Sequence, residues 1–189
     1  MRFHLIDRIL EVELGRSLRA VKNLTLGEEY LADHFPTFPV MPGVLMLGAL
    51  IEAGAWLWRA STDFRYSVTV LREAKNVKYG TFMEPGRRML VTVELLQQDV
   101  ATATFKGKGE VDGTTTVSAQ FRLGGYNRVE REGPAARTSD EQLVVGLRDA
   151  YAALLRVRSA ACEVRKEDPS STLRVPHAAL ESTRKDSAP

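Results

Sequence analysis

The sequence predicts an α+β domain in which an antiparallel sheet wraps around one long central helix. Residues 43–60 are apolar on every face and contain a single acid, Glu52, which predicts a helix surrounded by other elements. Two short stretches with alternating apolar residues precede this helix, and four stretches rich in Val, Thr, Phe and Leu follow it. Because a curved sheet can enclose an apolar helix, these observations together predict the fold class.

The order of the elements follows from local signals. Two strands are predicted at 3–13 and 17–26, joined at 14–16, and residues 27–33 predict a short helical turn. After the helix, strands are predicted at 66–80, 87–98, 101–111 and 114–123. Such a sheet leaves one edge and part of the helix uncovered, and a second copy of the chain is expected to cover them.

Turns and prolines mark the boundaries between these elements. Glu84-Pro85-Gly86 and Asp112-Gly113 favour tight turns between strands. Ahead of the helix, three prolines fix φ and make the chain stiff; they are Pro36, Pro39 and Pro42. Pro42 is tolerated at the start of a helix because its missing N–H would have no partner there.

The chain divides into three expected parts. Residues 1–125 form the sheet-and-helix domain, 126–160 a polar linker followed by a C-terminal helix, and 161–189 a disordered tail. Thr138 or Ser139 can cap the C-terminal helix. Its apolar positions recur at helical spacing and are Leu143, Val144, Leu147, Tyr151, Leu154 and Leu155.

Composition excludes several classes of protein. The chain has 189 residues, a formal net charge of +2 and 26% charged residues. Its Lys and Arg residues are nearly balanced by acids, so it lacks the excess of positive charge that is typical of a nucleic-acid binder. A lone Cys162 leaves no disulfide framework, and without a Cys or His cluster no metal site is predicted. Charges near the N-terminus argue against an export signal, and the prolines leave too short an apolar run for a membrane span. We expect a cytoplasmic protein.

His34 is the strongest candidate for chemistry. The stiff loop holds its imidazole near the start of the helix, where the amides of Gly43 and Val44 are unsatisfied donors able to bind a carbonyl oxygen or an anion. A base and an oxyanion hole would then lie close together. The alternative is an ordinary loop histidine with its hydrogen bonds satisfied.

Glu52 is the second candidate. A carboxylate on an apolar helix must be paired, protonated or turned toward a cavity, and burial favours the protonated form. It is therefore a candidate general acid or base. It could equally lie on a solvent-exposed stripe of the helix, or pair with an arginine such as Arg59 or one from another subunit.

The segment "HFPTFPVMPGVLML" resembles the signature of the (3R)-3-hydroxyacyl-acyl-carrier-protein dehydratases of fatty acid synthesis, the FabZ/FabA type with the hot-dog fold. The resemblance runs from about residue 3 to residue 124 and includes "FHLIDRILEVELGRSLRAVKNLT" and "AKNVKYGTFMEPGRRM". It implies a hot-dog homodimer, often a trimer of dimers. The substrate it implies is an acyl chain on the phosphopantetheine of an acyl carrier protein, with no other cofactor.

This resemblance places the catalytic histidine on His34 and the backbone amide that polarises the thioester on Gly43. The family's acid stands fourteen residues after the histidine, in the helix of the other subunit, and that position is Gly48 here. Eighteen residues after His34 stands Glu52, where the family usually has Gln. Glu52 lies on nearly the same helix face one turn further along, and Gly48 is expected to open space between it and the site.

Three readings follow. In the first, Glu52 or a water that it holds replaces the acid, and the protein is a dehydratase with altered geometry. In the second, the chain is a non-catalytic paralogue that binds the acyl chain or carrier, or a subunit of a heteromeric dehydratase completed by a partner's acid. The third, a hot-dog thioesterase with Glu52 as base, is less favoured because such enzymes do not need the braced histidine loop.

Further residues are expected around the substrate. The predicted substrate-binding residues are Phe35, Phe38, Pro42, Val44, Gly48 and Phe82, and a tunnel for the acyl chain could also include Met41, Met46 and Met83. A basic rim for an acidic carrier protein could be formed by Lys75, Lys78, Arg87, Arg88, Lys106 and Lys108, which could equally be ordinary solvated strand residues.

Overall fold

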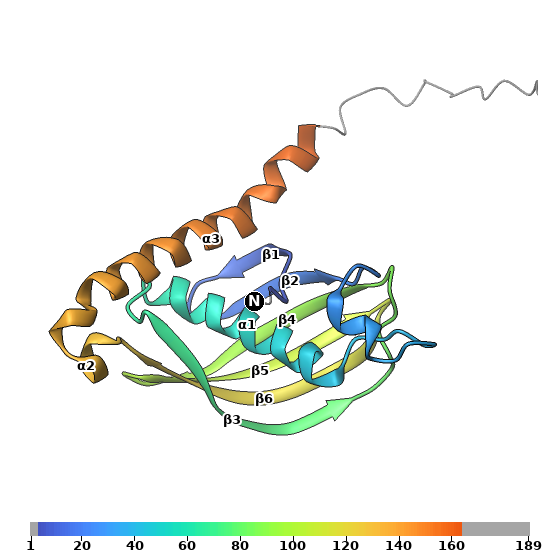
Figure 1. The fold of residues 1–189 in the computed structure, drawn as a ribbon, viewed down its shortest axis with the longest axis horizontal. Helices are drawn as coiled ribbons and strands as arrows, with labels where there is room; N and C mark the ends of the chain where they lie inside the picture. Colours follow the sequence, from blue (N-terminus) through green and yellow to red (C-terminus); the bar gives the residue numbers. More distant parts are fainter. Residues whose placement is uncertain (1–3, 164–189) are drawn as a thin grey trace, which may run out of the picture.

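The structure is a computed structural model that describes residues 4–163, and it confirms the predicted hot-dog architecture of a sheet curved around a central helix (Figure 1). The elements in chain order are β1 (Arg8–Glu13), β2 (Ser17–Asn23), the 3-10 helix η1 (Glu29–Ala32), α1 (Gly43–Ser61), β3 (Val68–Tyr79), β4 (Arg88–Gln98), β5 (Thr102–Val111), β6 (Thr114–Tyr126), α2 (Val129–Glu132), the 3-10 helix η2 (Pro134–Ala136) and α3 (Arg137–Glu163).

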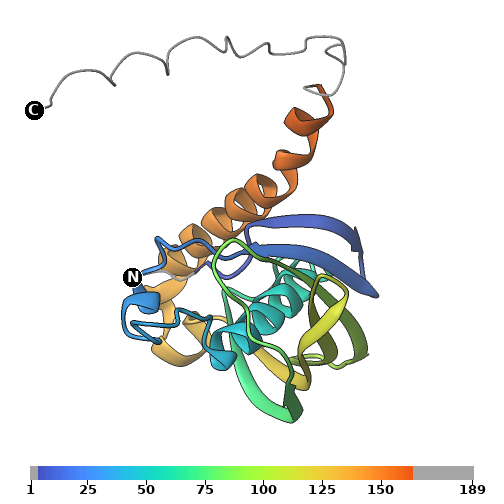
Figure 2. The same ribbon diagram turned by 90° about the vertical axis from the view of Figure 1, so that its right-hand side faces the viewer.

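All neighbouring strands of the six-stranded sheet run antiparallel, in the order β1-β2-β4-β5-β6-β3. The hairpin between β5 and β6 turns at Asp112 and Gly113, both with positive φ, as the Asp-Gly pair predicted. Strands β1 and β3 form the two edges. The sheet curls so that its inner face surrounds α1, as the two orthogonal views show (Figures 1 and 2).

The first strand starts later than predicted. Strand β1 begins at Arg8, whereas alternation alone suggested residue 3. The backbone N–H of Leu5 donates to the carboxylate of Glu52 on α1, so Leu5 is held by a helix side chain, whereas the Asp7 amide already donates to Val21 of β2. Local alternation cannot reveal such a partner, because the partner lies far away in the sequence.

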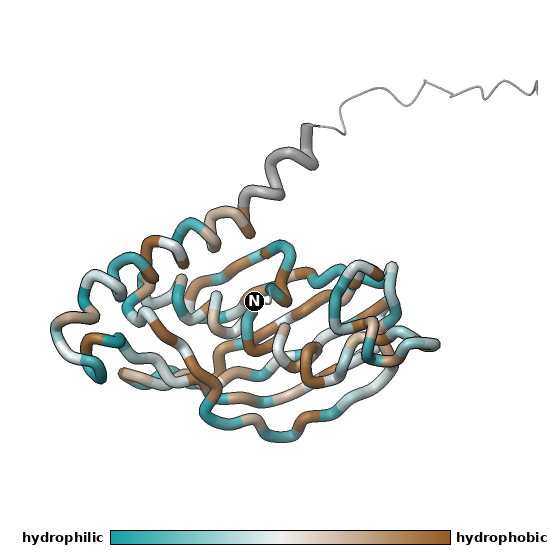
Figure 3. Tube along the Cα trace, viewed as in Figure 1, coloured by the Kyte–Doolittle hydropathy of each residue, from teal (hydrophilic) through white to brown (hydrophobic). Residues whose placement is uncertain are grey.

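Helix α1 begins directly after Pro42 and packs its small and aliphatic residues onto the sheet. Met46, Ala49, Leu50, Ala53 and Leu57 are all buried. The trace coloured by hydropathy shows that α1, inside the curve of the sheet, contains many apolar residues (Figure 3). Part of α1 stays uncovered by the sheet, as the sequence predicted. Val44 is 68% exposed, and Leu47 and Ile51 are only half-buried.

The length and composition of α1 would also suit a membrane span, contrary to the expectation of too short a run. It has 19 residues, but half of its apolar window is buried inside the domain. In this fold it is the central core helix.

The region between the domain and the C-terminal helix is more ordered than the predicted linker. Gly133 adopts φ +85° and Pro134 opens η2, which continues directly into α3. Thr138 and Ser139 therefore lie inside the first turn of α3 and not at its cap. The helix runs to Glu163, past the predicted boundary at 160, and residues 164–189 of the expected tail lie outside the described residues.

Contacts near the middle and the start of α3 attach it to the domain. The ring of Tyr151 lies 6.1 Å from that of Trp56 and 5.7 Å from that of Phe64, measured between centroids. Near its start, the buried carboxylate of Asp140 accepts hydrogen bonds from the Ser67 hydroxyl and from the Val129 amide at 2.8 Å. Helix α3 therefore packs against β1 and touches α1 through Trp56 (Figure 2).

Candidate functional site

The loop from His34 to Pro42 fixes the imidazole through two hydrogen bonds with a single residue. The Val40 amide donates to the His34 carbonyl oxygen at 3.1 Å, and His34 Nδ1 lies 2.9 Å from the Val40 carbonyl oxygen. A carbonyl only accepts, so Nδ1 must carry the proton. In the neutral ring Nε2 is then left with its lone pair available to a substrate. The ring is half-buried and stacks on Phe35.

Two further contacts anchor this loop to the domain. The Met41 amide donates to the Met83 carbonyl at 2.9 Å, and the His34 amide donates to the Tyr30 carbonyl at 3.1 Å. The turn that contains Tyr30 is held by Lys22, which is 3% exposed and donates to Glu28 at 2.6 Å. Burial, with the negative charge of Glu28, raises the pKa of the Tyr30 phenol above its ordinary value. The sequence offered no signal for this buried pair.

The start of α1 presents free backbone donors. Its first backbone hydrogen bonds are those from Leu45 and Met46 to the Pro42 carbonyl, at 2.9 and 3.1 Å. The amides of Gly43 and Val44 precede them and so have no partner within the helix. Such donors, at the positive end of the helix dipole, suit a developing oxyanion. The role of the Gly43 amide as an oxyanion donor stays a prediction.

Tyr79, at the end of β3, is a neighbour of this helix start that sequence reasoning missed. A Cβ on Gly43 would stand 2.9 Å from the Tyr79 ring, so only glycine lets the ring lie this close to the backbone. The ring is half-exposed. Its signal in the sequence was weak, because an aromatic residue in a strand is common.

Three of the predicted substrate-binding residues are exposed aromatic side chains, and their contact with a substrate stays a prediction. Phe35 and Phe38 are 52% and 46% exposed, and Phe82 is 67% exposed. The rings of Phe38 and Phe82 meet edge to face at 5.9 Å. Together with Val44 they make an apolar rim of the loop and the helix start. Met41, Met46 and Met83, which were predicted as possible tunnel residues, are buried in the core.

Glu52 is engaged by the N-terminal segment. Its Oε2 accepts from the Leu5 amide at 2.7 Å and its Oε1 from the Trp56 indole at 3.3 Å, with His4 Nδ1 3.8 Å away. Its side chain is 18% exposed. Both carboxylate oxygens therefore already have donors within this chain.

The predicted partner Arg59 takes a different position. It donates to the Thr69 hydroxyl at 2.5 Å and lies over the Trp56 ring. Burial lowers the pKa of its guanidinium to about 10, against the opposing charge of Glu52. Arg59 therefore acts as a packed structural cation between α1 and β3.

The space beside Gly48 is filled by Leu5. A Cβ on Gly48 would stand 2.7 Å from Leu5 Cδ1, closer than carbon atoms tolerate. The expectation that Gly48 opens a path between Glu52 and the site is therefore wrong. The N-terminal segment occupies the place that a side chain at residue 48 would need.

The predicted basic rim does not surround His34. Strand alternation places Lys78, Lys106 and Lys108 on the outer face of the sheet, turned away from α1. Lys75 pairs with Glu73 at 3.1 Å. The remaining two arginines of the predicted rim, Arg87 and Arg88, lie at the start of β4, where Arg87 pairs with Asp112 at 2.5 Å.

Among the side chains that the structure describes, in residues 4–155, no three of His, Cys, Asp or Glu lie together as a possible metal site.

Comparison with known proteins identifies the family. The FabA-like domain family matches residues 1–120. The 3-hydroxyacyl-[acyl-carrier-protein] dehydratase FabZ of Albidiferax ferrireducens is 39% identical over 122 residues, covering 63% of this chain and 81% of that protein. The FabZ of Bacillus subtilis is 35% identical over 124 residues, covering 65% and 88%.

Solved structures support the fold. The dehydratase heterocomplex ApeI:P from Xenorhabdus doucetiae aligns with a TM-score of 0.58 at 16% identity, covering 67% of this chain and 86% of that one. The smu.793 protein of Streptococcus mutans, bound to acetyl CoA, aligns with a TM-score of 0.51 at 13% identity, covering 67% and 95%. The chain therefore belongs to the FabA-like family of 3-hydroxyacyl-acyl-carrier-protein dehydratases.

Proposed function

We propose that this chain takes part in the dehydration of a 3-hydroxyacyl thioester, carried on an acyl carrier protein, to the trans-2-enoyl thioester in cytoplasmic fatty acid biosynthesis. The observation that carries the proposal is the Nδ1 hydrogen bond of His34 to Val40, which leaves Nε2 as an acceptor on a loop that leads directly into the start of α1. No cofactor is needed, since the substrate brings its own phosphopantetheine.

In the proposed reaction each group has one task. His34 Nε2 removes the proton from the carbon next to the thioester carbonyl. The Gly43 amide donates to the carbonyl oxygen as negative charge develops there. An acid protonates the β-hydroxyl, which leaves as water while the double bond forms. His34 and Gly43 supply the first two tasks, and the third needs a carboxylic acid.

Glu52 could supply this acid, but its contacts favour another source. Both of its oxygens already accept hydrogen bonds, from Leu5 and from Trp56. Catalytic groups need close placement, and a shift by one helical turn is about 5 Å. We therefore favour an acid from a partner chain over Glu52, which would make this protein one subunit of a heteromeric dehydratase. The Xenorhabdus neighbour, itself a dehydratase heterocomplex, is a precedent for that kind of assembly.

The surface features fit a partner that covers α1 and β3. Strand β3 has 12 residues and is an edge of the sheet, and Val44 on α1 is 68% exposed. An unpaired edge and an exposed apolar flank are stabilised when a second chain adds to them. Either a second copy or a paralogue could do so, and a trimer of such dimers would be the larger assembly.

The test is an absorbance assay of enoyl thioester formation on acyl carrier protein, with this chain alone and mixed with a FabZ relative whose catalytic histidine is replaced. Activity that appears only in the mixture, and disappears with His34→Ala, supports the heteromeric reading. Activity of the chain alone that is lost in Glu52→Gln supports Glu52 as the acid. A chain that binds the acyl carrier without turnover in either setting is a binding subunit.

A further inference from the structure

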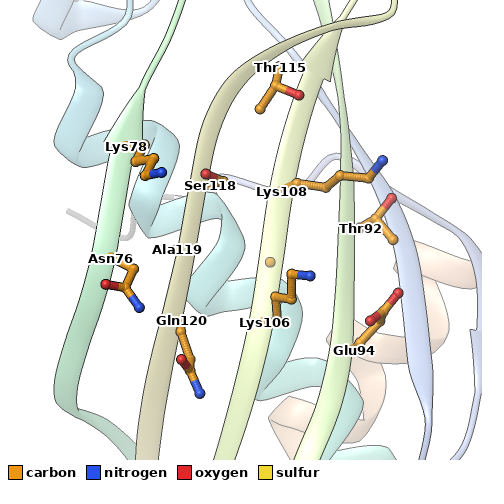
Figure 4. Close-up of a pocket in the computed structure, with 11 residues that line it drawn as sticks. Asn76, Lys78, Thr92, Glu94, Lys106, Lys108, Thr115, Ser118, Ala119 and Gln120 are labelled. Carbon is orange, nitrogen blue, oxygen red and sulfur yellow. The ribbon is translucent and has the colours of Figure 1, made fainter.

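The outer face of the sheet, turned away from α1 and His34, holds a recess of about 540 Å³. Strands β3, β4, β5 and β6 all contribute to its lining, and its side chains are polar (Figure 4). Three ammonium groups, from Lys78, Lys106 and Lys108, line it together with one carboxylate, Glu94. The recess is thus a cationic site separate from the proposed catalytic one.

The pairing of the strands arranges these groups in two rows. In the first row, Lys108 stands opposite Thr92 on one side and Ser118 on the other, and Lys78 stands on the far side of Ser118. Short hydroxyl side chains therefore lie between long cationic ones. In the close-up, Lys78 points toward Ser118, whereas Lys108 extends toward Thr92 (Figure 4).

The second row repeats this pattern with amides. Lys106 stands between Glu94 on β4 and Gln120 on β6. Asn76 from β3 closes the row beside Gln120 (Figure 4). Hydroxyl and amide groups donate hydrogen bonds to carboxylates, so both rows offer donors as well as charge.

Internal ion pairs do not neutralise the recess. Lys108 pairs with Glu110 at 3.0 Å, at the rim. Among the described residues, neither Lys78 nor Lys106 forms a salt bridge, although Glu94 stands directly opposite Lys106 in the strand register. Two ammonium groups are therefore available to an outside anion.

A β-bulge in the edge strand turns side chains into the recess. The register of β3 against β6 shifts between Lys75 and Lys78, and Asn76 within the bulge has a φ of +52°. Bulges redirect side chains at edges and near functional sites. This bulge places Asn76 and Lys78 together on the lining.

A second, smaller recess of about 170 Å³ extends the same surface. It is lined by Lys75, Arg122 and Glu73 among others, and it shares Gln120 with the first. The cationic groups thus form a band across the sheet and do not converge on one point. Such a spread of charge suits an extended ligand with several separate negative groups better than one compact anion.

We propose that this outer face binds an acidic segment of a partner polypeptide, laid across β5 and β6, with its carboxylates on Lys78 and Lys106. We choose an acidic peptide as the ligand because of charge complementarity: the lining combines unpaired ammonium groups with hydroxyl and amide donors. Most of the lining side chains end in a charged group, a hydroxyl or an amide, and an acyl chain or an apolar helix would leave these groups without partners.

The experiment measures the fluorescence anisotropy of a labelled peptide titrated with the full-length protein at low and at moderate salt. The peptide has 12 residues of alternating Glu and Ala, a length of about the span of the sheet face. A peptide with Gln in place of Glu is the ligand control. The test variant carries Lys78→Gln and Lys106→Gln. The protein control carries Arg16→Gln and Arg65→Gln, which removes the same charge from exposed positions elsewhere.

We expect the Glu peptide to bind and the Gln peptide not to bind, with about a 10-fold loss of affinity in the lysine variant and none in the arginine control. Glu94→Gln should strengthen binding, because it removes the one carboxylate of the lining. Equal losses in both double variants would overturn the proposal, since they would indicate attraction by net charge alone.

Two other results would also contradict it. Displacement of the peptide by an equal concentration of pyrophosphate would assign the recess to compact anions. A fall in molecular mass of the lysine variant in analytical ultracentrifugation would assign this face to contacts between copies of the chain. Dehydration through His34 is independent of all these outcomes, so failure here leaves the proposed function untouched.

Discussion

Leu5 packs against Gly48 so closely that a side chain at residue 48 would require the Leu5 Cδ1 methyl group to move. The distance from Leu5 Cδ1 to an ideal Cβ on Gly48 is 2.7 Å, and Leu5 is held in place by the bond from its own amide to Glu52. Residues 5, 48 and 52 therefore act as one unit. The N-terminal segment therefore contacts both Gly48, where the family has its acid, and Glu52, the candidate substitute acid.

The first prediction concerns Gly48. Gly48→Glu should destabilise the domain by about 1–3 kcal/mol, because the new side chain must push Leu5 out of the core. Gly48→Ala should change stability by less than about 1 kcal/mol, since the gain in helix propensity offsets a small movement of the Leu5 methyl group. Urea denaturation measures both.

Leu5→Ala provides the control for this prediction. If the contact is the cause, Leu5→Ala combined with Gly48→Glu should show a coupling energy of at least about 0.5 kcal/mol. Simple additivity of the two changes would show that Leu5 is not what excludes the larger side chain.

The second prediction separates the structural from the catalytic role of Glu52. Glu52→Gln keeps an oxygen acceptor for the Leu5 amide, so its stability should stay close to that of the wild type. Glu52→Leu leaves that amide without an acceptor, which should cost about 1–3 kcal/mol and speed hydrogen exchange at Leu5. Similar losses in both variants would mean that the bond from Leu5 contributes little.

The third prediction is a dependence of stability on pH through Asp140. Burial raises the pKa of this carboxyl, but hydrogen bonds from Ser67, Val129 and Arg128 outweigh burial and hold the pKa below its ordinary value of 3.8. A lowered pKa in the folded state stabilises the protein above the unfolded-state value. This stability is lost as the pH falls through the folded-state pKa.

Thermal unfolding between pH 2 and pH 7, about the range in which a carboxyl titrates, tests this prediction. Asp140→Asn should have a flatter curve at acid pH than the wild type, whereas Asp149→Asn, an exposed position on the same helix, should leave the curve unchanged. Parallel curves for Asp140→Asn and the wild type would rule out this carboxyl as the source.

The fourth prediction concerns the attachment of α3. Tyr151→Ala should destabilise the protein by about 2 kcal/mol, because it removes an aromatic side chain that is half-buried against Trp56 and Phe64. Tyr151→Phe keeps the ring and should be close to neutral. The fluorescence of Trp56 reports on the contact, and an unchanged spectrum in Tyr151→Ala would mean that α3 does not dock there.

Most of the fold could be predicted because its signals are local. The Asp112-Gly113 turn, the alternation in β5 and the prolines before α1 each depend on neighbouring residues. Strand β1 was the least accurate element, since Leu5 is held by Glu52, 47 positions away. Local patterns carry no information about such a partner.

The candidate site was predictable only in part, for a similar reason. The donors at Gly43 follow from any helix that starts at that residue, and the fixed position of His34 follows from the prolines. The packing of Tyr79 on Gly43, the burial of Lys22 with Glu28 and the filling of the space at Gly48 all depend on distant segments. For that reason the sequence predicted an opening at Gly48 where the structure has Leu5.

The paired bonds between His34 and Val40 make the imidazole and its loop a single cooperative unit. Because the ring and the backbone of His34 bond to the same residue, opening the loop releases the ring in the same event. The Nδ1 proton of this histidine is therefore a natural reporter of loop closure. Its resonance in a proton NMR spectrum, and its exchange with water, would follow the loop without a label at the site.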